Sequence, residues 1–249
     1  MSRSVSAENQ ITQGVIWKQI LVFFFPILFG TFFQQLYNTF DAIIVGQFVG
    51  KQALAAVGGG TSNLVNIVVN LFTGMAAGTT VVVAQGVGAR DPERVRKTVH
   101  TSAVMSLVGG LVFTVVGILA ARPALVAMGT PDDVMEYAVQ YLIAYCLGMI
   151  PSFFYNVGAG ILRAVGDTKR PLYFLIVACL VNIVLDIVFV AVMGMGALGA
   201  GLATMISQWV SAALVYISLS GTSAIYRLDK NQLGFDQASL SRVLQVGIP

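Results

Sequence analysis

Six long apolar stretches run through this 249-residue chain and constrain its fold more than any other feature. They cover residues 18–48, 53–85, 99–121, 134–162, 171–194 and 197–219. Each stretch reaches the roughly 20 residues that a helix needs to cross a bilayer. We expect helices, because backbone groups in lipid must form their hydrogen bonds within the segment. The pattern therefore predicts an all-α membrane protein, built as a bundle of six transmembrane helices.

The composition agrees with a membrane protein and argues against several other classes. Hydrophobic residues make up 57% of the chain and charged residues 10%, whereas soluble domains carry roughly 25% charged residues. The net charge of +3 gives no reason to expect a nucleic-acid partner. Cys146 and Cys179 both lie inside apolar stretches, so no disulfide framework is expected. We infer that the chief partner of the chain is the lipid bilayer.

The polar segments divide the chain into three parts. Residues 1–219 form the six-helix lobe, residues 220–240 a cytoplasmic linker, and residues 241–249 the truncated start of a seventh helix. Pro26 and Pro151 lie inside apolar stretches and are predicted kink points.

Two glycine motifs and the single histidine lie in or beside the predicted spans. Gly58-Gly59-Gly60 and Gly74-x-x-x-Gly78 are typical of close helix packing rather than of phosphate binding. His100 follows the basic run Arg94-Val95-Arg96-Lys97, so we expect it on a solvated face.

The placement of lysine and arginine predicts the orientation in the membrane. With the N-terminus in the cytoplasm, all but two of the 14 basic residues lie inside, and only Lys51 and Arg122 lie outside. The inside set is Arg3, Lys18, Arg90, Arg94, Arg96, Lys97, Arg163, Lys169, Arg170, Arg227, Lys230 and Arg242. Such an asymmetry is the usual signature of cytoplasmic loops. The chain is therefore predicted to be a multi-pass protein of the plasma membrane with a cytoplasmic N-terminus.

Two carboxylates lie within the predicted spans. Asp41 is near the outer end of the first span and Asp186 is well inside the fifth, so both fall in the outer half of the membrane. An ionised carboxylate at this depth is costly, and it needs a partner, a cation or a proton. The alternative is a static buried hydrogen bond that only orients the helices, although Ser, Thr and Asn usually serve that purpose.

Polar residues recur at helical spacing in five of the six spans. The stripes are Gln34, Asn38 and Asp41; Asn63, Asn66 and Asn70; Tyr141, Tyr145, Ser152 and Asn156; Asn182 and Asp186; and Thr204, Gln208 and Ser211. Each stripe places its polar groups on one helix face. We therefore expect a shared polar cavity, lined by Gln34, Tyr37, Asn38, Asn66, Asn70, Tyr145, Asn156 and Gln208.

These residues resemble the multidrug and toxic compound extrusion (MATE) transporters, in particular their bacterial DinF-like branch. The matching motifs in the first two spans are Pro26, Gln34-Gln35-x-Tyr37-Asn38-x-x-Asp41 and Ala84-Gln85-x-x-Gly88-Ala89. Those of the fourth and fifth are Arg163-Ala164-x-Gly166-Asp167-Thr168-x-x-Pro171 and Asn182-x-x-x-Asp186. The resemblance covers essentially the whole chain, which would correspond to the N-terminal lobe of a 12-helix transporter.

The resemblance implies a function as well as a fold. It implies an antiporter that exports small organic cations or amphipathic drugs by alternating access, with inward H⁺ or Na⁺ as the coupling ion and no other cofactor. It assigns the ion site to Asp41, Asn182, Asp186 and Thr204, with Na⁺ as a possible metal at Asp41 and Asp186, and it assigns helix bending to Pro26. It also implies that transport requires a C-terminal lobe.

Three alternatives remain open at this point. A lipid-linked oligosaccharide flippase of the same superfamily would need several cationic residues in its cavity, and the spans carry essentially none. A membrane-embedded enzyme would need a nucleophile, base or metal cluster, and the only ionisable groups within the spans are two carboxylates. An intramembrane aspartyl hydrolase has such a pair, but the chain carries no accompanying signature of one. We therefore predict no enzymatic activity and no catalytic residues. The third alternative is a half-lobe that only assembles and transports nothing.

Overall fold

The computed structural model describes residues 16–232 and 234–247, and its regular elements are all helices. The long ones are α2 (Ile16–Phe48), α4 (Gly60–Gly88), α5 (Pro92–Ala127), α8 (Lys169–Asp186) and α9 (Gly196–Ser220). The shorter ones are α3 (Lys51–Gly58), α6 (Asp132–Leu147), α7 (Met149–Ala164), the π-helix η1 (Ile187–Val192), the 3₁₀-helix η2 (Lys230–Gln232) and α10 (Gln237–Gly247). Each predicted apolar stretch thus corresponds to one helix or to two consecutive helices.

The lengths of these helices fit a membrane bundle. Four segments of the described chain are long and apolar enough to cross a bilayer, namely 61–88, 92–127, 169–192 and 196–220. The bent pair α6 and α7 makes a fifth. The remaining predicted span corresponds to α2, which is 33 residues long. Exposed side chains along the bundle are largely apolar, as Leu119 (74% exposed) and Val192 (76%) illustrate, which suits contact with lipid.

Two of the predicted spans are interrupted. The second breaks at Gly59, so the prediction of a single helix over 53–85 was wrong there: a side chain at Gly59 would collide with the Ala55 carbonyl, 2.5 Å away. The fourth breaks at Gly148, with a bend of 47° between α6 and α7. Pro151 explains this bend, because it has no N–H to donate to the carbonyl of Leu147. Pro26 lies inside the continuous helix α2.

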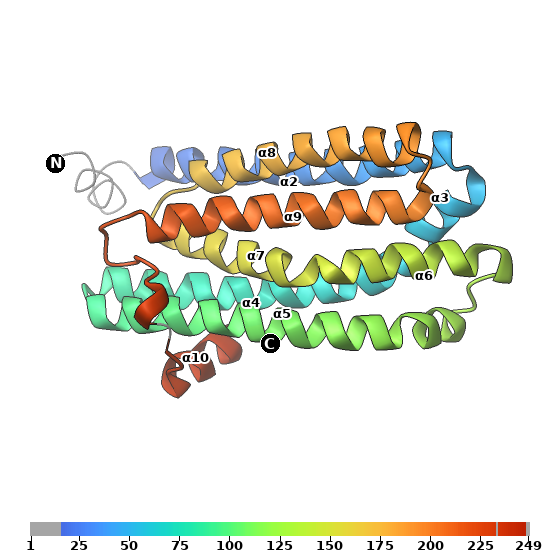
Figure 1. The fold of residues 1–249 in the computed structure, drawn as a ribbon. Coiled ribbons are helices and arrows are strands. Elements are labelled where there is room, and N and C mark those ends of the chain that lie inside the picture. Colours follow the sequence, from blue (N-terminus) through green and yellow to red (C-terminus); the bar gives the residue numbers. More distant parts are fainter. Residues whose placement is uncertain (1–15, 233, 248–249) are drawn as a thin grey trace.

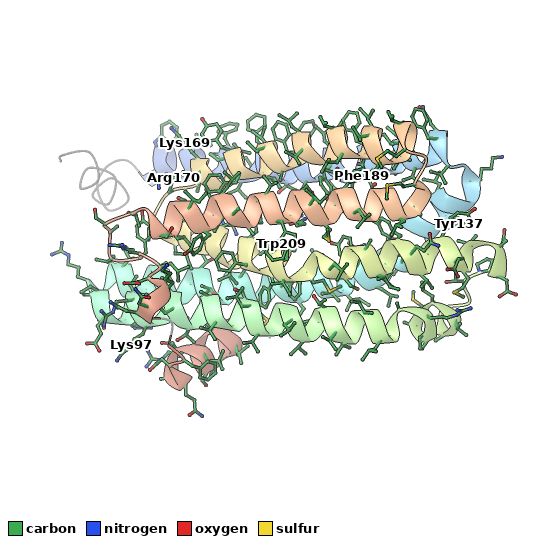
Figure 2. All side chains as sticks on the ribbon, viewed as in Figure 1. Lys97, Tyr137, Lys169, Arg170, Phe189 and Trp209 are labelled. Atoms are coloured by element: carbon green, nitrogen blue, oxygen red, sulfur yellow. The ribbon has the colours of Figure 1, made fainter. Side chains whose placement is uncertain are left out.

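The helices form stacked layers (Figure 1). α2 and α8 form one layer, α9 packs on α8, and the broken pair α6–α7 packs on α9. α4 and α5 pack on α7 from the other side, and the short helix α10 lies against α4 and α5. One end of the bundle carries Lys97, Lys169 and Arg170, and we refer to it as the basic end; Tyr137 lies near the opposite end (Figure 2).

The buried side chains form two clusters of different size. The larger one centres on Phe72 and Phe153, whose rings stack with centroids 4.3 Å apart, and on Phe113, which meets Phe72 edge to face. The smaller cluster consists of Ile44, Val45, Tyr141, Val190, Ala197 and Ala200. It joins the ends of α2, η1 and α9 that lie away from the basic end. Cys146 and Cys179 are both free and buried, as the sequence predicted.

Close helix packing at Gly74 and Gly78 is confirmed. A side chain at Gly74 would meet the Gly247 carbonyl at 2.6 Å, and one at Gly78 would overlap the Val243 carbonyl of α10. Gly58, by contrast, has nothing within 4 Å of the position that a Cβ would take. It is the last residue of α3 and does not mediate close packing against another helix.

The prediction of a solvated His100 was wrong. Its side chain is 4% exposed and bonds to the segment that follows α9. The basic run beside it does face solvent at Arg96 and Lys97, whereas the segment after α9 covers His100, one turn further along α5.

Candidate functional site

α2 carries Asp41 on the one face of its final turns that points into the bundle. Asp41, Ile44 and Val45 are buried at spacings of three and four residues, while Ile43 and Phe48 are exposed. Both faces of these turns are largely apolar, as expected for a span in contact with lipid, and the inward stripe contains one carboxylate. Asp41 is 4% exposed and so has left water almost completely.

α8 supplies the second carboxylate from an equally narrow stripe. Its inward residues Ala178, Asn182 and Asp186 follow each other at intervals of four, and both Asn182 and Asp186 are 0% exposed. Asp186 is also the last α-helical residue before η1. A π-helix widens the helix by one residue per turn and is often found at functional positions.

α9 completes the site with hydroxyl groups. Thr204, Ser207 and Ser211 are all buried on the face that meets α8 and α6. Ser207 donates to the Thr204 carbonyl at 2.8 Å. Its oxygen also lies 3.3 Å from the hydroxyl of Tyr37, one turn before Asp41 on α2. This contact ties α2 to α9 beside the two carboxylates.

Asp41 and Asp186 lie on α2 and α8, which pack against each other. The Tyr141 hydroxyl donates to Asp41 Oδ2 across 3.4 Å. In the described part of the chain, ion pairs occur at Lys97–Glu93 and Arg170–Asp167, so neither buried carboxylate has a basic partner. Two unpaired buried carboxylates can persist only if a proton or a cation neutralises them.

The four residues predicted as the ion site share a further property. Asp41 Oδ1, both Asp186 oxygens, Asn182 Oδ1 and Nδ2, and Thr204 Oγ1 are buried and make no protein hydrogen bond. Buried polar groups nearly always have a partner. Arg94 Nε is the one other such atom in the described residues. These unsatisfied atoms are therefore concentrated where α2, α8 and α9 meet, in an arrangement rich in oxygen, which suits a hard cation or a proton.

The predicted cavity residues do not gather in one place. Tyr37, Tyr145, Asn156 and Gln208 are half-buried, and Asn156 donates to the Ser152 carbonyl at 2.8 Å. Gln34, Asn38, Asn66 and Asn70 are exposed on the surfaces of α2 and α4. A groove of about 570 Å³ runs along the end of α2 and is lined by Asn38, Thr39, Ala42, Ile43, Gly46, Gln47 and Leu54. The assignment of these residues to a substrate pathway stays a prediction.

Two residues that contact the site were not assigned to it from the sequence. Tyr141 belongs to a recognised polar stripe, but only the bend between α6 and α7 and the packing of α6 on α9 bring it to Asp41. Ser207 lies one turn after Thr204, and this i, i+3 spacing could have suggested it.

Known proteins resemble this chain in family, sequence and structure. The family model described as MatE matches residues 26–188. Among curated proteins, the probable multidrug resistance protein YoeA of Bacillus subtilis (strain 168) is 27% identical over 241 residues, covering 94% of this chain and 52% of YoeA. The probable multidrug resistance protein YpnP of the same strain is 30% identical over 200 residues, covering 80% and 45%.

Solved structures give the same result. A crystal structure described as MATE in the bent conformation superposes with a TM-score of 0.90 at 29% identity, covering 99% of this chain and 55% of that one. An outward-facing multidrug resistance MATE transporter of the MOP superfamily gives 0.89 at 29% identity, covering 100% and 54%. The chain thus spans about half the length of the relatives and solved structures it matches.

Proposed function

This chain belongs to the MatE family, and on that basis we propose that it forms one lobe of an exporter driven by inward H⁺ or Na⁺. The exported compounds would be organic cations or amphipathic drugs. The curated relatives YoeA and YpnP carry the name of multidrug resistance proteins. The observation that carries the proposal is the cluster of buried, unpartnered oxygen atoms on Asp41, Asn182, Asp186 and Thr204.

The proposed ion has a specific electrostatic task. Asp41 and Asp186 are buried without a basic partner, and an uncompensated buried charge costs several kcal/mol. A bound proton or Na⁺ would remove most of this cost. The carboxylates could take a proton, and the same oxygens with Asn182 Oδ1 and Thr204 Oγ1 could coordinate Na⁺. The donor set therefore supports a coupling ion of either kind.

Ion binding would then be linked to transport through the helices that meet at the site. Asp41 is on α2, whereas Asp186 and Thr204 are on α8 and α9. An arrangement that brings these residues together is favoured when an ion is bound, and one that separates them is favoured when the ion has left. If substrate prefers the second arrangement, ion and substrate compete through one conformational equilibrium. Alternating access would follow from this competition in the two-lobed protein.

A transport assay with matched variants tests the proposal. Everted membrane vesicles with the two-lobed protein would receive a fluorescent organic cation in the external medium. Its accumulation in the lumen would be driven by either a proton or a Na⁺ gradient, with the higher ion concentration inside the vesicle. We expect Asp41→Asn and Asp186→Asn each to abolish gradient-driven transport. Asp133→Asn, an exposed aspartate at the start of α6, should behave as wild type. Unchanged transport in both buried-site variants would refute the proposal.

A further inference from the structure

His100 is the single histidine of the chain, and it joins α5 to the segment between α9 and α10. Its ring is buried near the basic end of the bundle. Nδ1 lies 2.8 Å from the Arg96 carbonyl oxygen, one turn earlier in α5. Nε2 accepts the backbone N–H of Asp229 at 3.1 Å, and 129 residues of chain separate the two. Both ring nitrogens are therefore engaged with backbone groups.

These two partners fix the protonation state of the ring. A carbonyl oxygen can only accept a hydrogen bond, so Nδ1 must carry a hydrogen. A backbone N–H can only donate, so Nε2 must be unprotonated. The neutral imidazole with hydrogen on Nδ1 satisfies both contacts. An imidazolium carries hydrogen on both nitrogens, so its Nε2–H would face the Asp229 N–H and the contact would be lost.

The segment that His100 holds is docked by several further contacts. The Thr101 hydroxyl oxygen accepts the Asp236 N–H at 3.0 Å, and Arg96 donates to Gln232 Oε1 at 3.2 Å. Leu228 is 4% exposed, and its N–H donates to the Leu219 carbonyl at 3.0 Å. Histidine is the side chain whose charge changes between about pH 5 and 8. His100 is therefore the side chain in this joint whose protonation would remove a hydrogen bond to the docked segment.

The charged groups around this joint come from several elements. α4 and α9 carry none. The others supply Glu93, Arg94, Arg96 and Lys97 on α5, Arg163 on α7, Arg242 on α10, and Arg227, Asp229, Lys230 and Asp236 on the docked segment. Arg122 of α5 and Asp132, Asp133 and Glu136 of α6 lie at the opposite end of the bundle. Glu93 pairs with Lys97 at 2.8 Å. The Asp229 carboxylate accepts the Asn231 N–H at 2.9 Å and Asp236 accepts the Ser239 N–H at 2.7 Å. Both carboxylates thus bond within their own segment.

We propose that His100 makes a proton-sensitive contact: protonation of its ring releases residues 228–232 and 234–236 from α5. This segment leads directly into α10, which packs on α4 through the backbone contacts of Gly74 and Gly78. Release would therefore loosen the attachment of α10 to the bundle. The proposal concerns the basic end and does not depend on the ion site or on transport.

Spin-label mobility tests the release directly. The exposed Lys230 would be replaced with cysteine and labelled in lipid nanodiscs, with a chain lacking this cysteine as the background for the buried Cys146 and Cys179. We expect the mobile fraction of the label to rise severalfold as the pH falls from about 8 to about 5.5. In His100→Gln the side-chain oxygen can still accept the Asp229 N–H but cannot titrate, so the pH response should disappear. Thr101→Val should raise mobility at every pH and leave the pH response in place.

Because the chain has a single histidine, the protonation state of its ring can also be measured directly. Ring ¹⁵N spectra of protein with isotope-labelled histidine should show the Nδ1–H tautomer at about pH 8. The ring should become protonated over the same pH range in which the spin label at position 230 becomes mobile. A label that does not respond to pH in the parent chain would overturn the proposal. So would an equal pH response in His100→Gln, or a ring that stays neutral while the segment is released.

Discussion

Tyr141 on α6 donates a hydrogen bond to Oδ2 of Asp41 on α2 across 3.4 Å, although 100 residues separate them in the chain. In the described part of the protein this is the only hydrogen bond made to either buried carboxylate. The remaining oxygen atoms of Asp41 and Asp186 are the ones that we propose contact the coupling ion. The contact also links the α6–α7 bend to the candidate ion site.

Tyr141→Phe removes this donor and leaves the ring in place. The 3.4 Å contact is long for an O–H···O hydrogen bond, so the apparent affinity for the coupling ion should change by at most about tenfold. The measurement is the ion-concentration dependence of dye transport by the two-lobed protein. Tyr137→Phe, an exposed tyrosine one turn earlier in α6, is the matched control. An unchanged ion dependence in Tyr141→Phe would show that the contact has no influence on the site.

Tyr37 and Ser207 are expected to act as a pair, because their oxygen atoms lie 3.3 Å apart between α2 and α9. A double-mutant cycle with Tyr37→Phe and Ser207→Ala should give a coupling energy of about 0.5–1.5 kcal/mol in thermal unfolding. Tyr37→Phe with Ser211→Ala, which is further along α9, provides the comparison cycle. Additive effects in the first cycle would mean that the pair does not hold the two helices together.

Gly78→Ala should loosen α10 from α4. The new methyl group would overlap the Val243 carbonyl and lie 2.9 Å from the Gly247 nitrogen, so the backbone of α10 must move. Overpacking of this kind typically costs about 1–3 kcal/mol. Gly88→Ala is the control, since a methyl group there meets nothing within 4 Å. Equal thermal stability of the two variants would contradict the packing described for α10.

Asp236 should make the start of α10 sensitive to strong acid. The hydrogen bond from Ser239 lowers the pKa of the Asp236 carboxyl below its ordinary value of 3.8. A lowered folded-state pKa means that the stabilisation is complete above the ordinary value and is lost as the pH falls through the folded-state value. A spin label at the exposed position 245 of α10 should thus become mobile only below about pH 4, measured with His100→Gln to remove the response near neutral pH. Asp236→Asn, which can cap the helix without titrating, should abolish this step.

The sequence predicted the elements of the fold well because spans in lipid follow from length and apolarity. Four of the six stretches became single α-helices or, for 171–194, an α-helix continued by a π-helix. The breaks at Gly59 and Gly148 depend on local backbone geometry, and only the second had a signal, in Pro151. The π-helix after Asp186 depends on how η1 packs against α2 and α9, which no local pattern encodes.

The sequence predicted some of the candidate site residues and misplaced other polar residues. Asp41, Asn182, Asp186 and Thr204 were predicted from intramembrane carboxylates and from family resemblance, and the structure brings α2, α8 and α9 together around them. Spacing alone, however, could not separate inward from outward polar faces. Asn66 and Asn70 form as regular a stripe as Asn182 and Asp186, yet they are exposed in this lobe. His100 was misplaced for a related reason, because its partner Asp229 is distant in the sequence.

We propose that Asp41 and Asp186 bind the coupling ion, and a count of bound ions tests this directly. Purified two-lobed protein in nanodiscs would be titrated with acid and with Na⁺ in the absence of substrate, and the protons or Na⁺ bound per protein would be counted. We predict that wild type and Asp133→Asn bind equally, and that Asp41→Asn/Asp186→Asn loses the protons or Na⁺ that wild type binds at this site. Equal uptake by wild type and the double variant would contradict the account.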